Sequence, residues 1–202
     1  MPPESRPMSY SRSELTRLVM PHMQNVLGSL FGGELMAMVD QAAAVAAIRH
    51  AGGPVLTAAI DRVDFREQIP IGALVTLLGT VDYVGNSSMD ITVEVYSEKV
   101  STGERRHTHT AHIVFVAIDQ SGKPTRVPRL VAETPEEQAR YEAARKHREG
   151  FRRRFRLPYR DFYTEVLPHV PLEELEAHFR PAFDEVVAGA APDAIRAGLA
   201  VE

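Results

Sequence analysis

The sequence predicts an α+β fold in which one long helix lies against one antiparallel sheet. The helix is indicated by an apolar run over residues 31–50, which ends at the glycines and proline of AGGP, residues 51–54. The sheet is indicated by β-branched and alternating segments separated by short polar turns, over residues 55–65, 73–84, 89–98 and 105–119. Because no helical segment separates these strands, we expect hairpin connections between them.

Composition limits the classes of function. The chain has 202 residues, 44% hydrophobic and 25% charged, and a net charge of -4, which is typical of a soluble globular protein without general attraction for nucleic acid or membrane surfaces. It has no cysteine, which excludes disulfides, thiolate metal sites and a cysteine nucleophile. The amino end lacks a secretory signal, and the longest apolar run, residues 42–48, is far shorter than the ~20 residues of a membrane helix. We therefore expect a cytoplasmic protein that binds neither nucleic acid nor membrane.

The chain divides by composition into four segments. Residues 1–12 are rich in proline, serine and arginine and are expected to form a mobile tail. Residues 13–132 hold the helix and the strands of the folded domain. Thr134-Pro135-Glu136-Glu137 is a capping box, so residues 133–157 should form a helix, which becomes strongly basic toward its end. Residues 158–202 contain weak amphipathic patterns and are expected to be a helical extension, whose role the sequence does not indicate.

The long helix carries a single carboxylate, Asp40, in the middle of its apolar run. An ionised carboxylate is costly in an apolar setting unless it has a partner. Two interpretations are open from the helix alone. Asp40 either forms a structural pair with an arginine or a backbone amide at a subunit contact, or serves as a general base.

The helix also begins at a bare glycine pair, Gly32-Gly33. A helix start presents unpaired N–H groups and a partial positive charge, and glycines let a ligand come close to them. Such a place suits a carbonyl oxygen that becomes negative during acyl transfer, although a glycine pair also serves close packing of a helix on a sheet. Asp40 lies roughly 10 Å along the helix from Gly33. If the two groups cooperate, either the ligand extends along the helix or a symmetry-related subunit completes the site.

The run MPHMQNVLGSLFGGELMAMVDQAAAVAAIRH, residues 20–50, resembles the signature of hotdog-fold acyl-CoA thioesterases of the YciA and cytosolic acyl-CoA hydrolase group. The resemblance continues in order through VLTAAIDRVDF, VGNSSMDITVEV, FVAID and PRLVAETPEE, and covers about residues 12–147. It implies a hotdog fold, in which an antiparallel sheet wraps a long central helix, here with a helical C-terminal extension. It also implies self-association into dimers whose sheets join, or into trimers of such dimers.

Residue by residue, the resemblance implies a catalytic role for Asp40 and a partner role for Asn25, which come from different subunits of the dimer. The backbone N–H of Gly33, with Gly32 beside it, would polarise the thioester carbonyl. Asn25 would orient water or the thioester, and Asp40 would act as general base toward water. Direct attack by Asp40, giving a mixed anhydride, is the other possibility.

The resemblance further implies that the turn VGNSSM binds the pantetheine and phosphates of CoA. Gly85, Asn86, Ser87 and Ser88 would offer backbone amides and hydroxyls there. Asn86 stands where many relatives carry arginine, so this turn departs from the family pattern.

Other residues invite weaker hypotheses. His107, His109 and His112 could suggest a metal site, but strand alternation is expected to put His107 and His109 on one face and His112 on the other, and a solvent-facing set is favoured. Asp61 and Asp64 lie near the end of a predicted strand; Asp64 could support the site, although a turn or capping role is favoured for it. No G-x-S-x-G elbow supports a serine triad.

The basic stretch FRRRFR, residues 151–156, could neutralise the 3′-phosphate of CoA, although a solvated helix end is the more common role of such a run. Its two interleaved aromatic residues give only weak support to RNA binding.

The resulting expectation is an acyl-CoA hydrolase that releases CoA and a carboxylic acid without a metal or redox cofactor. The alternative from another class is a non-catalytic acyl-CoA binding protein or sensor on the same fold. A hotdog hydratase is a further enzyme alternative, but its pattern of acid and histidine is not visible here.

Overall fold

The structure, a computed structural model, describes residues 4–154. The predicted extension 158–202 and the side chains of the basic stretch 151–156 lie outside the described residues. The elements in chain order are β1 (Ser5–Pro7), β2 (Ser13–Leu18), α1 (Gly32–Ala51), β3 (Val55–Phe65), β4 (Leu74–Val84), β5 (Ser88–Lys99), β6 (Glu104–Ala117), β7 (Arg129–Val131) and α2 (Pro135–Arg154), with short 3-10 turns at Met8–Ser11 and Pro21–Met23.

The main sheet has five strands in the order β2-β4-β5-β6-β3, and all neighbouring pairs are antiparallel. Hairpins join β4 to β5 and β5 to β6, as predicted. The predicted hairpin between the first two strands is wrong, because β3 pairs with β6 at the far edge of the sheet while β4 lies between β2 and β5. The strand pattern in the sequence specified which residues are extended but not which strand each one pairs with.

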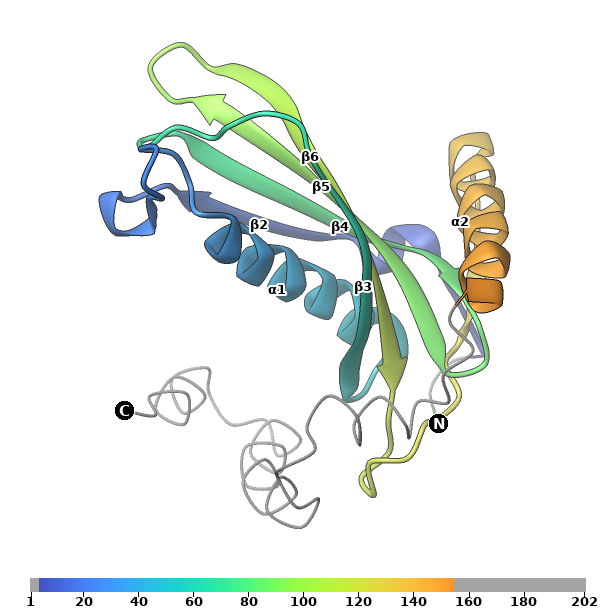
Figure 1. Ribbon diagram of the computed structural model, residues 1–202. Coiled ribbons are helices and arrows are strands. Elements are labelled where there is room, and N and C mark those ends of the chain that lie inside the picture. Colours follow the sequence, from blue (N-terminus) through green and yellow to red (C-terminus); the bar gives the residue numbers. More distant parts are fainter. Residues whose placement is uncertain (1–3, 155–202) are drawn as a thin grey trace. The chain divides into compact units, whose positions relative to one another are not determined.

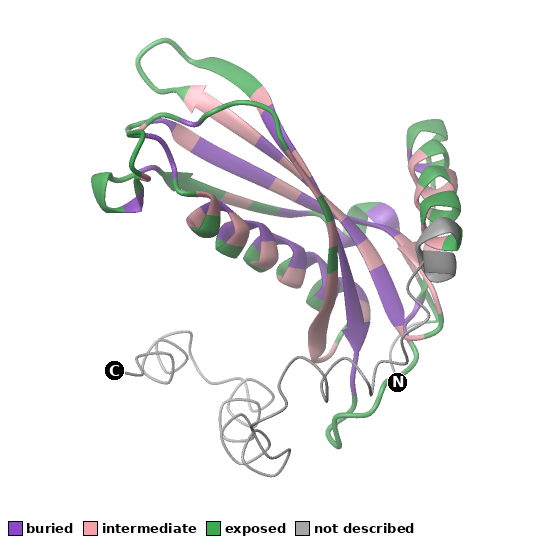
Figure 2. Ribbon diagram, viewed as in Figure 1, coloured by how far each residue is buried: buried purple, intermediate pink, exposed green. Residues whose placement is uncertain are grey.

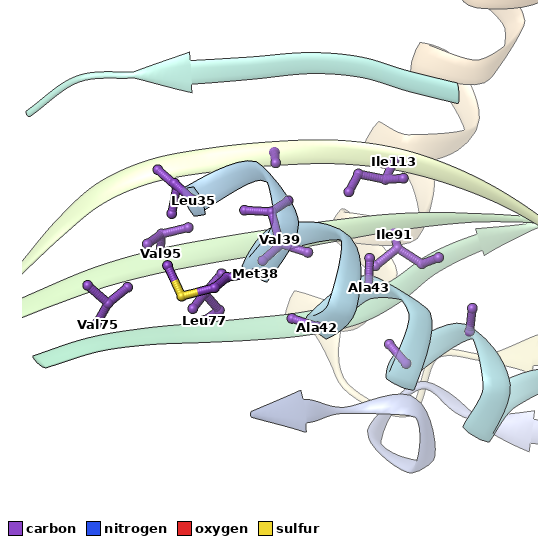
Figure 3. Packing of buried hydrophobic residues seen from close by; sticks show 14 of the residues in the cluster. Leu35, Met38, Val39, Ala42, Ala43, Val75, Leu77, Ile91, Val95 and Ile113 are labelled. Carbon is purple, nitrogen blue, oxygen red and sulfur yellow. The ribbon is translucent and has the colours of Figure 1, made fainter. Parts of the chain in front are cut away.

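The helix α1 lies in the concave side of the curved sheet (Figure 1). Figure 3 shows the apolar side chains of α1 pointing toward those of β4, β5 and β6. The buried face of α1 is rich in alanine. The buried residues of this core include Leu35, Met38, Val39, Ala42, Ala43, Val75, Leu77, Ile91, Val95 and Ile113.

Small residues let the backbone of α1 come close to β4. A Cβ added at Gly79 would lie 2.9 Å from the carbonyl oxygen of Ala42, so this strand position admits only glycine without a shift of the backbone. The hydroxyl of Ser13 donates to the same carbonyl at 2.7 Å. Strand and helix are thus joined at one buried point.

Burial alternates along β5 (Figure 2), whereas β6 contains an irregularity. Opposite β5, Tyr96 pairs with His107 whereas Val95 pairs with His109, so one extra residue, Thr108, is inserted in β6. The prediction that His107 and His109 share a face is therefore wrong. His109 lies with buried Val95 on the side of α1, whereas the ring of His107 packs against Tyr96.

The amino-terminal segment differs from the expected mobile tail. Residues 5–7 form β1, which pairs in parallel with β7, and residues 8–11 form a 3-10 turn with buried Met8 and Ser11. The fully buried His50, near the end of α1, reaches toward this region through a 3.0 Å hydrogen bond between Nε2 and the carbonyl of Pro128. Since a carbonyl only accepts, Nε2 carries the proton.

The helix α2 begins at the predicted capping box. The N–H of Glu137 donates to the Thr134 hydroxyl, and the Glu137 carboxylate accepts from the N–H of Glu133. The side chains of α2 contact the face of the sheet opposite α1, where Arg140 forms a two-bond ion pair with the buried Asp82. Within the described residues, neither helix is long and apolar enough to cross a membrane.

Candidate active site

The amino end of α1 is open. Phe31, the residue before the helix, provides no side-chain cap, and the first intrahelical bond runs from Leu35 N–H to the carbonyl of Phe31. Among the described residues, no acceptor bonds the N–H groups of Gly32, Gly33 or Glu34. These three donors can therefore receive a ligand oxygen, as the glycine pair predicted.

Two exposed aromatic rings flank this end. The Phe31 ring lies over Gly33, where an added Cβ would come within 2.3 Å of its Cε1 atom. The Phe65 ring of β3 lies beside Gly32, 3.9 Å from the corresponding Cβ position. Phe31 and Phe65 are 54% and 56% exposed in the single chain, so two apolar rings lie beside the three N–H donors at its surface. This combination suits a ligand with an apolar body and a polar carbonyl.

Asp40 is held by a residue that the sequence did not single out. The hydroxyl of Thr57, on β3, donates to Asp40 Oδ1 at 2.8 Å. Asp40 is half-buried in the single chain, and its second oxygen, Oδ2, has no hydrogen-bond partner within the described residues. The bond fixes one carboxylate oxygen and leaves the other free to take a proton.

Asn25 organises the loop before α1. Its Oδ1 accepts the N–H groups of Leu27 and Ser29, at 2.9 and 3.2 Å, and its Nδ2 donates to the Ser29 hydroxyl at 3.0 Å. Because backbone N–H groups only donate, these bonds define which end of the amide is oxygen. One hydrogen of Nδ2 remains for a ligand.

The predicted catalytic residues do not converge within one chain. No hydrogen bond in the described part of the chain joins Asn25 to Asp40. Gly33 and Asp40 are separated by two turns of α1, about 10 Å of helix. The amino end and the middle of α1 thus present different parts of the expected chemistry.

The predicted CoA-binding turn is well ordered by backbone bonds. The carbonyls of Ser88, Asn86 and Ser87 accept from Gly85, Val127 and Ala117 N–H groups, at 2.7, 3.1 and 2.8 Å respectively. Within the described residues, the N–H groups of Asn86 and Ser87 have no protein acceptor.

Ser88 differs from the rest of this turn. Its side chain is buried, and its hydroxyl accepts from Arg148 of α2 at 2.9 Å. The Ser88 hydroxyl is therefore already bonded within the protein, whereas the Asn86 side chain is exposed.

The remaining polar candidates serve other contacts. Asp64 pairs with Arg62 and Arg66, and the hydrogen bond from Arg62 lowers the pKa of that carboxyl. Asp61 pairs with His147 of α2. Neither contact is a turn or helix cap.

A cavity of about 440 Å³ lies between α2 and the sheet, on the face opposite Asp40. Its lining includes Asp82, whose pKa burial raises even beside Arg140, and His112, whose pKa burial lowers. Among the described residues, no group of three or more histidine, aspartate or glutamate side chains is arranged to hold a metal ion.

The helix in the curve of an antiparallel sheet, with its open amino end, defines a hotdog-type domain. Residues 27–104 match the model of the thioesterase superfamily. The chain is 42% identical over 135 residues to a Bacillus subtilis protein named as an uncharacterized acyl-CoA thioester hydrolase, covering 67% of this chain and 78% of that one.

Solved structures agree. A hexameric acyl-CoA thioesterase superposes with a TM-score of 0.73 at 41% identity, covering 75% of this chain and 97% of that one. An acyl-CoA hydrolase of Staphylococcus aureus, solved with butyryl-CoA and CoA, gives 0.70 at 35% identity, covering 74% and 92%. This chain belongs to the thioesterase superfamily and has its hotdog fold, which confirms the predicted family and fold class.

Proposed function

We propose that this protein is an acyl-CoA thioester hydrolase. The observation that supports it most is the presence of an open helix end at Gly33 and of a half-buried carboxylate, Asp40, whose Oδ1 is fixed by the Thr57 bond while Oδ2 stays free. Together they supply donors for a developing oxyanion and a base for water, which are the two requirements of thioester hydrolysis.

In the proposed reaction, Asp40 Oδ2 removes a proton from water as the water oxygen bonds to the thioester carbon. The carbonyl oxygen becomes negative and accepts the N–H of Gly33 from the other subunit, because Gly33 and Asp40 of one chain lie about 10 Å apart. The carbon–sulfur bond then breaks, and the proton held by Asp40 passes to the departing thiolate, giving CoA and a carboxylic acid. The remaining Nδ2 hydrogen of Asn25 orients the water or the thioester. A mixed anhydride formed by attack of Asp40 is the alternative; when water attacks the aspartyl carbon of that anhydride, labelled water oxygen enters the Asp40 carboxylate.

The site is proposed to form between two subunits. The outer edge of β3 has no pairing strand among the described residues, and Ile60 and Phe65 on this strand are 44% and 56% exposed. On α1, Val45 and Ile48 are also exposed. A second copy of the chain that adds its β3 to this edge would cover these side chains and bring Asn25 of one subunit toward Asp40 of the other. Such dimers could assemble further, as trimers of dimers.

The spacing of residues altered in a relative supports these assignments. In the Staphylococcus aureus enzyme, structures carry an asparagine, an aspartate or a threonine replaced singly by alanine. Those positions are separated by 15 and 17 residues, the same intervals that separate Asn25, Asp40 and Thr57 here.

The test is CoA release, measured with a thiol reagent across acyl-CoAs of different chain length. Wild type is expected to release CoA, and Asp40→Asn and Asn25→Ala to lose most of that activity while remaining folded. Release that survives both substitutions would show that the site lies elsewhere. Binding of acyl-CoA without any release by wild type would instead favour the sensor.

A further inference from the structure

We infer that Arg148, on α2, is a positioning residue for CoA: it holds the turn of residues 85–88 so that its free amides face the ligand. The inference rests on the proposed function, because that function makes this turn a CoA site. The residue lies outside the strand–turn–strand segment, sixty positions along the chain from Ser88. It therefore acts on the turn from a different element.

The contacts of Arg148 reach the turn at its closing residue. One guanidinium nitrogen, Nη2, donates to the Ser88 hydroxyl at 2.9 Å, and the other, Nη1, donates to Asp90 Oδ1 at 3.0 Å. The Arg148 side chain is only 13% exposed. A charged pair with so little solvent contact has a more definite geometry than a surface ion pair.

Ser88 transmits this contact to the turn. Its carbonyl accepts the N–H of Gly85 at 2.7 Å, and its hydroxyl occupies the space where a Gly85 side chain would begin, 2.8 Å from the Cβ position. The carbonyls of Asn86 and Ser87 accept the N–H groups of Val127 and Ala117. Because three carbonyls of the turn are bonded within the protein, its backbone conformation is fixed. The unbonded N–H groups of Asn86 and Ser87 then stay available to an anionic acceptor.

The electrostatic setting agrees with this role. The turn Gly85-Asn86-Ser87-Ser88 has no charged side chain of its own. Arg148 places a guanidinium beside Ser88, the last residue of the turn. The Asp90 carboxylate neutralises part of the Arg148 charge and fixes the orientation of the guanidinium. Loss of Arg148 would thus loosen the turn and leave it without this cation.

The test compares Arg148→Gln with wild type on acyl-CoA and on the same acyl group carried by N-acetylcysteamine, which lacks the phosphates and most of pantetheine. We expect KM for acyl-CoA to rise about tenfold, the equivalent of about 1.4 kcal/mol, with kcat nearly unchanged. KM for the short thioester should stay at the wild-type value. A general effect on folding would change the kinetic constants for both substrates and lower the melting temperature, and would overturn the positioning role.

Two further variants separate positioning from charge. Arg148→Lys keeps the charge but cannot contact Ser88 and Asp90 with one planar fork, so it should recover only part of the affinity. Full recovery by lysine would overturn the positioning role. The matched control is Arg145→Gln, which removes an arginine from the same helix whose partners, Glu142 and Glu149, also lie on α2; it should leave both substrates unaffected.

The outcomes distinguish this inference from the proposed function. An active wild type with an unchanged KM in Arg148→Gln overturns the inference alone. If wild type binds CoA in calorimetry but hydrolyses nothing, the hydrolase proposal fails, and weaker CoA binding by Arg148→Gln would still support the inference. If wild type neither binds nor hydrolyses, both are overturned.

Discussion

The bond between Thr57 and Asp40 is the contact through which a strand residue controls the proposed base. The Thr57 hydroxyl occupies Oδ1 at 2.8 Å, so in the proposed mechanism Oδ2 is the oxygen that takes the proton from water. The sequence indicated Asp40 because a lone acid in an apolar helix is unusual. It gave no comparable signal for Thr57, because threonine is an ordinary residue in a strand and only the folded chain brings its hydroxyl to the helix.

We predict that Thr57→Val, which keeps the side-chain shape and removes the hydroxyl, lowers kcat about tenfold and changes KM little. The physical reason is the loss of a charge-assisted hydrogen bond that orients the base. Steady-state CoA release measures the effect, and Thr16→Val on the exposed part of β2 is the control. Wild-type kcat in Thr57→Val would contradict the orienting role.

At the scale of elements, the contact between α1 and β4 determines how closely helix and sheet approach. Gly79 faces the carbonyl of Ala42, and the Ser13 hydroxyl fills the remaining space, 2.5 Å from the Gly79 Cβ position. An added methyl group would have to move helix backbone rather than a flexible side chain.

Gly79→Ala is therefore expected to lower the free energy of unfolding by about 1–3 kcal/mol, the usual cost of overpacking a core. Urea unfolding measures this change. Gly53→Ala is the control, because a methyl group there has no neighbour within 4 Å. Equal stability of the two variants would mean that α1 is not in close contact with β4.

Much of the element pattern could be predicted from the sequence. The bounds 55–65 agree with β3 residue for residue, because β-branched residues end there at polar turns. The pairing of β3 with β6, the parallel β1–β7 pair and the extra residue at Thr108 could not be predicted. Each depends on which distant segment supplies hydrogen-bond partners, which local periodicity does not encode.

The same contrast between local patterns and long-range contacts applies to the candidate site. The glycine pair predicted the open end of α1, because a helix start without a capping side chain is a local property. The hydrogen bond between Arg148 and the Ser88 hydroxyl could not be predicted, because a contact between residues sixty positions apart leaves no local pattern in the sequence.

At the scale of the molecule, buried histidines connect stability to pH. Burial is the main cause that lowers the pKa of His50, and it also lowers those of His109 and His112. At these three rings the unfolded chain therefore binds more protons near pH 6 than the folded protein does. The stability from these neutral rings is complete above the unfolded pKa, about 6.5, and is lost as the pH falls below it.

We predict that the free energy of unfolding decreases between pH 7.5 and 5.5, by at most about 1.4 kcal/mol per pH unit for each proton involved. His50→Gln should make this decrease smaller, because one of the responsible rings is gone. Urea titrations at both pH values measure it, with replacement of the exposed His22 by glutamine as the control. An identical pH dependence in His50→Gln and wild type would exclude His50 as a contributor.

Assembly is the other property of the whole molecule. Ile60→Glu places a charge on the exposed edge strand β3 and is expected to give smaller particles in light scattering, with loss of CoA release although Asn25 and Asp40 are intact. Val100→Glu, in the exposed turn after β5, is the control for added charge. Full activity in a monomeric Ile60→Glu protein would show that one chain suffices.

The measurement that tests the shared site most directly is complementation between two inactive variants. Asp40→Asn and Asn25→Ala subunits are unfolded together, refolded as mixed oligomers and assayed for CoA release. Random pairing should restore about a quarter of wild-type activity, because half of the dimers are mixed and each mixed dimer holds one intact site of its two. No recovery in oligomers shown by mass spectrometry to contain both variants would contradict a site in which Asn25 and Asp40 come from different subunits.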